Sequence, residues 1–130
     1  MKKLTAALII CFFVLSGMAI TVNAVNLGSY TGTVGTQYSK KMEKTVSASI
    51  DGTRLYVSTS NYNQVGFYQK AVLGNGITQV SPAGYVDVNT NNWCGFWSGY
   101  STVPNNALMA YMKSKSNLFN DTITYCNWWY

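Results

Sequence analysis

Short stretches of alternating apolar and polar residues recur along the chain after residue 24, separated by clusters of Gly, Asn, Ser and Pro. Alternation with a period of two predicts half-buried β-strands, and turn residues at such short intervals are typical of a sandwich or barrel. The pattern predicts a leading strand or ordered arm over 25–35 and strands over 65–73, 77–80, 84–88, 93–102 and 122–130. We therefore expect an all-β fold, a small antiparallel β-sandwich of about the size of an immunoglobulin domain.

The clearest local pattern lies between residues 45 and 60. Asp51-Gly52 is a favoured two-residue type I′ turn, and alternating segments flank it. If these segments pair outward from the turn, Val46 faces Val57 and apolar residues meet on one face of the pair. A shift of one residue would destroy this agreement. The pattern predicts a β-hairpin over 45–60.

Two other segments carry mixed patterns. Residues 38–44 hold three lysines and a glutamate, which predicts an exposed connection. Residues 107–113 are rich in the helix formers Ala, Leu and Met, and Asn105 or Asn106 could cap a helix. The same seven residues alternate cleanly, however, and seven residues suit a strand better than a helix, so we favour a strand.

The first 24 residues have the three parts of a secretion signal. Two lysines are followed by an apolar stretch over 4–20, and Val22-Asn23-Ala24 forms a cleavage site of the A-x-A type. The alternative is an uncleaved anchor helix, since the apolar stretch approaches the length that spans a bilayer. We expect cleavage after Ala24, which leaves residues 25–130 as one secreted, extracellular domain.

Composition narrows the possible functions. Residues 25–130 carry seven Lys/Arg and four Asp/Glu, a net charge of +3, which is too sparse for nucleic-acid binding. We interpret it as the slight basic bias of a soluble surface; the alternative is attraction to anionic cell-wall polymers or lipid headgroups. The chain has no histidine, and its four carboxylates are scattered, so no acid–base pair or triad is evident. We therefore expect no enzyme activity, no cofactor and no metal.

Two cysteines, Cys94 and Cys126, remain after cleavage. In an oxidising compartment an even pair predicts a disulfide, and two cysteines can pair in only one way. The loop of about 33 residues that the bond would close corresponds to roughly 3–4 kcal/mol of stabilisation. We expect this disulfide to join the strand over 93–102 to the last strand.

All four tryptophans lie within three residues of a cysteine. On alternation, Trp93 and Trp97 point away from the side of Cys94, whereas Trp128 shares a face with Cys126 and Trp129 takes the opposite one. A small core cannot easily absorb all four rings, so some are expected to form an exposed aromatic platform. The candidate binding residues are the terminal aromatic residues and the two cysteine-flanking tryptophans: Trp97, Trp129, Tyr130, Trp93 and Trp128.

The order of features over residues 45–130 resembles a family of small secreted proteins of Gram-positive bacteria that is classed only as a domain of unknown function. The features are Phe67-Tyr68, Gly74-Asn75-Gly76, Val80-Ser81, the aromatic segment Trp93–Tyr100, Asn105-Asn106-Ala107-Leu108 and a closing aromatic strand. The resemblance implies export and a β fold, and no activity. The chain departs from the family at its end, where Cys126 and Trp128-Trp129-Tyr130 stand in place of an acidic, Trp-containing tail.

A second resemblance, in architecture and in the last residues only, is to the lactococcin-type bacteriocins, which are small, β-rich, cationic and aromatic at the C-terminus. The favoured function is a secreted, non-enzymatic sandwich that binds the cell wall, a membrane surface or another secreted protein. The alternative is a bacteriocin-like antimicrobial protein that acts on a competitor's envelope. A secreted hydrolase or its inhibitor is the third class and the least favoured by the residues present.

Overall fold

The computed structural model describes residues 24–102 and 104–130. The expected secretion signal over 1–24, apart from Ala24, lies outside the described residues. None of the described residues belongs to a helix long and apolar enough to cross a membrane.

The described residues form ten β-strands and no helix, which confirms the all-β prediction. In chain order the strands are β1 (Asn26–Ser29), β2 (Gly32–Val34), β3 (Ser39–Thr45), β4 (Gly52–Thr59), β5 (Gln64–Leu73), β6 (Gly76–Gln79), β7 (Gly84–Asp87), β8 (Asn92–Gly95), β9 (Ala107–Ser114) and β10 (Asp121–Trp129). The expected strands over 65–73, 77–80, 84–88, 107–113 and 122–130 are confirmed. The strand expected over 93–102 is shorter and ends at Gly95.

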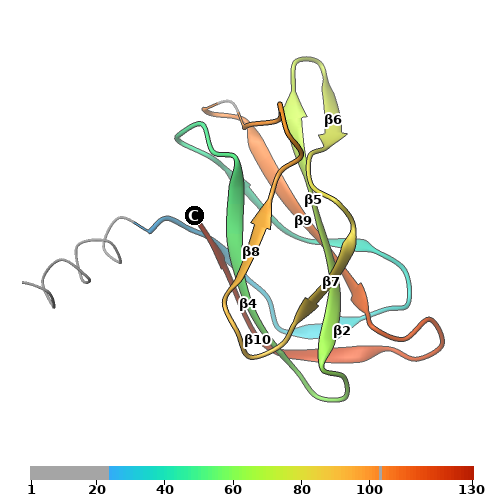
Figure 1. Cartoon of the computed structure of the whole chain (residues 1–130). Helices are drawn as coiled ribbons and strands as arrows, with labels where there is room; N and C mark the ends of the chain where they lie inside the picture. Colours follow the sequence, from blue (N-terminus) through green and yellow to red (C-terminus); the bar gives the residue numbers. More distant parts are fainter. Residues whose placement is uncertain (1–23, 103) are drawn as a thin grey trace, which may run out of the picture.

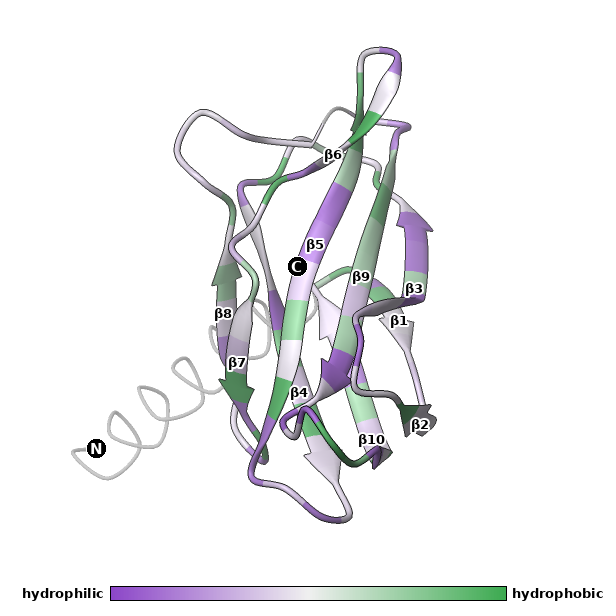
Figure 2. Cartoon of the chain, turned by 90° about the vertical axis from the view of Figure 1, so that its right-hand side faces the viewer, coloured by the Kyte–Doolittle hydropathy of each residue, from purple (hydrophilic) through white to green (hydrophobic). Residues whose placement is uncertain are grey.

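The strands form two sheets in which every pairing is antiparallel. Sheet A has the order β1-β10-β4-β8, and β2 pairs with the other end of β10. Sheet B has the order β3-β9-β5-β6, and β7 pairs with the other end of β5. The two sheets stack as the layers of a β-sandwich (Figures 1 and 2), as expected from the spacing of the strands.

The core lies between the sheets and is built from alternating inward positions of the long strands. Leu55 and Val57 on β4 are fully buried, and so are Leu108 and Met112 on β9 and Trp128 on β10. Burying one such side chain stabilises the fold by about 1.5–3 kcal/mol. The same alternation turns the intervening residues of β4 and β10 to the outer face of sheet A, where the candidate site lies.

A buried polar chain links the two sheets through the core. The indole Nε1 of Trp128 donates to Thr53 Oγ1 at 3.0 Å, and Thr53 Oγ1 donates to Gln69 Oε1 at 2.6 Å. Gln69 Nε2 in turn donates to the carbonyl oxygen of Cys94 at 3.2 Å, and the backbone N–H of Gln69 donates to Ser81 Oγ at 2.8 Å. Burying these groups costs little because their hydrogen bonds are made within the protein.

The predicted disulfide is wrong, because the fold keeps the two cysteines apart. Both thiols are free and buried. Cys126 on β10 pairs with Val57 and Cys94 on β8 pairs with Thr53, so β4 runs between them. Two strand spacings separate the cysteines by about 10 Å across the sheet, and four residues of offset add about 13 Å along it. A disulfide requires Cα atoms within about 7 Å.

The predicted hairpin over 45–60 is also wrong. Strand β4 pairs with β10 and β8, whereas residues 46–51 cross from sheet B to sheet A. This crossing segment is held by the loop before β9: Val46 N donates to Asn106 O, and Thr102 N donates to Ile50 O. Val46 is buried in the same core as β4, so the alternation was satisfied without a direct pairing.

The expected exposed connection over 38–44 is instead strand β3, at the edge of sheet B. Met42 faces the core, and the flanking residues Lys40, Lys41, Glu43 and Lys44 are at least partly exposed. Lysines on an edge strand discourage pairing with another chain. The polar character that suggested a loop therefore belongs to a protected edge, visible as the hydrophilic stretch of β3 in Figure 2.

Candidate functional site

A row of three side chains crosses the outer face of sheet A at one end. Arg54 on β4 pairs with Trp93 on β8 on one side and with Trp129 on β10 on the other. All three project outward, because their neighbours on these strands, Leu55 and Trp128 among them, fill the core. The row therefore consists of a guanidinium between two indoles.

The indole of Trp93 lies directly over two glycines, Gly52 and Gly95. A Cβ on Gly52 would be 2.5 Å from Trp93 Cζ2, and a Cβ on Gly95 would be 3.0 Å from Trp93 Nε1. The guanidinium carbon of Arg54 lies 5.3 Å from the centre of the ring, a cation–π contact. Trp93 is nevertheless 55% exposed, so much of the ring surface remains available to a ligand.

The row forms part of a groove of about 950 Å³. Gly52, Arg54, Trp93 and Trp129 line it together with residues of the crossing segment and of neighbouring loops, which are Ser49, Ile50, Asp51, Asn91 and Ser101. Ala24 and Tyr130 complete the lining. Small-molecule sites have volumes of roughly 300–1,000 Å³ and combine apolar walls with a few polar groups, as this groove does.

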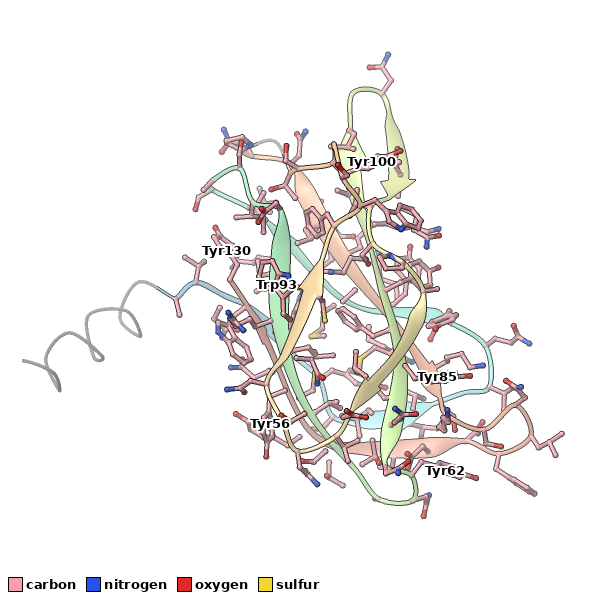
Figure 3. The ribbon with its side chains drawn as sticks, in the orientation of Figure 1. Tyr56, Tyr62, Tyr85, Trp93, Tyr100 and Tyr130 are labelled. Carbon is pink, nitrogen blue, oxygen red and sulfur yellow. The ribbon has the colours of Figure 1, made fainter. Side chains whose placement is uncertain are left out.

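Tyr130 is fixed in place as well as available to the groove. Its backbone exchanges hydrogen bonds with Val25, at 2.6 Å and 3.0 Å. Its ring packs against the core, and its hydroxyl lies 3.2 Å from Ser47 Oγ. Figure 3 shows Trp93 and Tyr130 near one another beside the C-terminus. The groove thus has rigid aromatic walls.

The polar groups of the groove are open to a ligand. Among the described residues the one ion pair joins Lys40 to Glu43, so the guanidinium of Arg54 has no carboxylate partner in this part of the chain. Asp51, Asn91 and Arg54 are all exposed and supply acceptors and donors around the two indoles. This combination suits a ligand with one apolar face and several polar groups, such as hydroxyl, amide or carboxylate groups.

Of the sequence-predicted aromatic residues, the structure brings Trp93, Trp129 and Tyr130 together and leaves the other two elsewhere. Trp128 is fully buried and takes no part in the surface. Trp97 is 43% exposed, but it lies outside the groove lining and packs against Tyr100 with ring centres 6.2 Å apart. Tyr100 lies near the top of the view in Figure 3.

Sequence reasoning missed Arg54, Gly52 and the polar rim of the groove. Alternation predicted that Trp93 and Trp129 point outward, but nothing local shows that β4 lies between their strands. An Asp-Gly pair reads as a turn, whereas here Gly52 is the first residue of β4 and provides space for an indole.

The lining of the groove holds one acidic side chain, that of Asp51. Burial raises the pKa of both cysteine thiols to about 12, so at neutral pH they are protonated and shielded from substrates. The described residues contain no group of three or more His, Cys, Asp or Glu side chains that could hold a metal ion.

Comparisons of the chain with models of protein families, with curated proteins and with solved structures found no match. The case for a function therefore depends on the groove itself.

Proposed function

We propose that the chain is a secreted, non-enzymatic β-sandwich that binds a carbohydrate polymer of the cell envelope through the groove around Trp93, Arg54 and Trp129. The observation that carries the proposal is the row itself, in which two outward indoles flank an unpaired guanidinium on a rigid sheet.

The chemistry of a sugar ring matches this row. One face of a pyranose presents C–H groups, which pack well on the negative face of an indole. The rim of the ring carries hydroxyl groups, which can bond to Arg54, Asp51 and Asn91. Trp93 and Trp129 stand two strand spacings apart, about 10 Å, which suits two sugar units of one polymer that are separated by a third.

The sheet makes this surface suitable for a polymer rather than for a single small molecule. On the same outer face, Tyr56 follows Arg54 along β4, and its ring meets that of Tyr125 edge to face at 5.7 Å. Tyr125 is 53% exposed. The aromatic surface therefore continues along sheet A beyond the groove, at right angles to the row of Trp93, Arg54 and Trp129, and is larger than one small molecule would cover.

Export is the second part of the proposal. It is supported by three features of the first 24 residues: two lysines near the start, an apolar stretch after them and the ending Val22-Asn23-Ala24. N-terminal sequencing of the protein recovered from culture medium should begin at Val25. Retention of the full-length chain in the membrane fraction would contradict export by cleavage.

The binding test uses residues 25–130, which contain all ten strands. Sedimentation with isolated Gram-positive cell walls, and titration with soluble peptidoglycan fragments, measure the affinity. Trp93→Ala and Trp129→Ala should each weaken binding at least tenfold, as expected for aromatic residues at the centre of a binding site. Trp97→Ala is the matched control, because Trp97 is an exposed tryptophan outside the groove, and it should bind normally.

Thermal unfolding separates loss of the site from loss of the fold. Trp93→Ala should unfold within a few degrees of the wild type, since it removes an exposed ring and one cation–π contact of about 0.5–1 kcal/mol. Folded groove variants that bind the walls as tightly as the Trp97→Ala control would refute the proposal.

A further inference from the structure

The loop between β9 and β10 presents the two most exposed large apolar side chains of the described residues. Leu118 is 82% exposed and Phe119 is 66% exposed. The loop is an ordered turn, because the backbone N–H groups of Leu118 and Phe119 both donate to Ser116 Oγ at 3.0 Å. Ser116 N in turn donates to Ser114 Oγ at 3.2 Å. Local hydrogen bonds therefore hold two apolar side chains out in solvent.

Two lysines lie close to this apolar tip, formed by Leu118 and Phe119: Lys113 is buried, whereas Lys115 is partly exposed. Lys113 Nζ donates to Asn117 Oδ1 at 2.7 Å, within the same loop, and lies 3.4 Å from the hydroxyl of Tyr85. Lys115 Nζ lies 3.9 Å from the centre of the Tyr85 ring. Neither lysine has an ion-pair partner among the described residues. Lys115 is thus the cation that a ligand at the tip can reach, beside the exposed ring of Tyr85.

The nearest acidic side chain on the same connection does not neutralise these cations. Asp121, the first residue of β10, is buried, and its Oδ1 accepts from the backbone N–H groups of Asn61 and Thr122. On β7, Asp87 accepts from Gln64 Nε2. Asp87 is exposed and keeps its charge, because Gln64 is neutral, so the charge that favours an anionic ligand at the tip comes from Lys115.

We propose that this end of the sandwich, formed by Tyr85, Lys115, Leu118 and Phe119, docks on an anionic lipid bilayer. Leu118 and Phe119 would enter the boundary between headgroups and acyl chains, Lys115 would meet lipid phosphates, and Tyr85 would lie at the interface, where tyrosine is favoured. A second copy of the chain fits less well, since two apolar side chains bury far less than the roughly 1,000 Å² of a stable interface. The like charges would also repel.

The tip and the groove lie far enough apart for both to be occupied at the same time. Strand β10 begins just after the tip and ends at Trp129 in the groove. Its nine residues span about 27 Å. In Figure 1 the β9–β10 loop and the C-terminus lie at opposite ends of the molecule. A bilayer at the tip would therefore leave the groove free.

The test measures partitioning of residues 25–130 into lipid vesicles by cosedimentation. Residues 1–24 are left out because their apolar stretch would itself enter lipid. Vesicles of phosphatidylcholine with phosphatidylglycerol should bind the protein, and binding should weaken as salt is added. Vesicles of phosphatidylcholine alone should bind it at least tenfold less.

Variants locate the contact. Leu118→Ser combined with Phe119→Ser should reduce partitioning at least tenfold, and Lys115→Gln should reduce it about fivefold. Ile77→Ser is the matched control, because Ile77 is a 61% exposed apolar residue on the hairpin at the opposite end of β5, and it should change nothing. Trp93→Ala should also bind vesicles normally, which keeps this surface distinct from the groove.

Three results would overturn the proposal. The first is no partitioning into the anionic vesicles, and the second is equal partitioning into both kinds of vesicle. The third is equal loss in the tip and Ile77→Ser variants. A shift to a dimer in sedimentation velocity that the tip variant abolishes would assign the tip to a second copy instead, and would overturn it too.

Discussion

Replacing Gln69 by leucine tests whether the buried polar chain holds the two sheets together. Gln69 is fully buried on β5 in sheet B, and its side chain makes three hydrogen bonds to residues of sheet A. Leucine has a similar volume but no polar atoms. The substitution removes the acceptor of the Thr53 hydroxyl and the donor to the carbonyl oxygen of Cys94.

Each buried group left without a partner costs about 1–3 kcal/mol. Because two groups lose their partner, we expect Gln69→Leu to lower the free energy of unfolding by about 2–5 kcal/mol, partly offset by the gain in apolar burial. A small domain has about 5–15 kcal/mol in total. The variant should therefore be much less stable, or fail to fold at 37 °C.

Urea denaturation followed by tryptophan fluorescence measures this loss, since Trp128 donates to the same chain of groups. Gln64→Leu is the matched control: Gln64 lies on the same strand, but its one hydrogen bond, to Asp87, is on the surface. The control should cost less than about 1 kcal/mol. Equal stability of Gln69→Leu and Gln64→Leu would show that the polar chain does not contribute to the stability of the sandwich.

Two other predictions concern the two buried thiols and the glycine under the Trp93 ring. The native protein should have the same mass before and after reduction, apart from any adduct, and both Cys94 and Cys126 should resist alkylation until it unfolds. Since burial raises the pKa of both thiols to about 12 from 9.0, the unfolded chain releases these protons first. The free energy that the two protonated, buried thiols contribute to stability is therefore fully present below about pH 9 and is lost as the pH rises from 9 to 12. A Cys94→Ala/Cys126→Ala variant should lose this part of the pH dependence in urea titrations, and an unchanged profile would contradict it. Gly52→Ala should cost about 1–3 kcal/mol and weaken cell-wall binding, because the new methyl would press on the Trp93 ring and lie 2.9 Å from Gly95 Cα. Gly84→Ala, where a Cβ meets nothing within 4 Å, should be neutral, and equal stability of the two variants would argue against the close contact.

The strands that bury one face could be predicted because alternation is a local property. Strand β5 and strand β10 follow the expected ranges closely, and so does β9, where seven alternating residues outweighed strong helix formers. The edge strand β3 was missed because its exposed positions are mostly lysines, and a single inward residue, Met42, does not make a recognisable pattern.

Pairing between strands could not be predicted in the same way. Val46 and Val57 are both buried, which agrees with a hairpin, but Val46 lies on the segment that crosses between the sheets and does not pair with β4. Likewise, an even number of cysteines says nothing of the distance between Cys94 and Cys126, which the order of strands in sheet A sets. The sequence predicted to which face of its own strand a side chain points. It did not predict which residue lies beside that side chain on the next strand.

The groove shows the same division. The outward direction of Trp93 and Trp129 follows from alternation around the cysteines, even though the disulfide that was expected to bring them together does not form. What brings them together is their common partner, Arg54 on β4. A site assembled from three strands in the order β8, β4 and β10 is visible only once that order is known.

The most direct test of the binding groove follows the four indole Nε1–H resonances of the folded domain by NMR while soluble peptidoglycan fragments are added. The four indoles occupy three environments: Trp93 and Trp129 lie in the groove, Trp97 on the surface elsewhere, and Trp128 in the core. We predict that the resonances of Trp93 and Trp129 shift together along one saturable curve, whereas those of Trp97 and Trp128 stay in place. Saturable shifts of the Trp97 resonance alone, or no shift of any of the four, would contradict the assignment of the groove as a carbohydrate site.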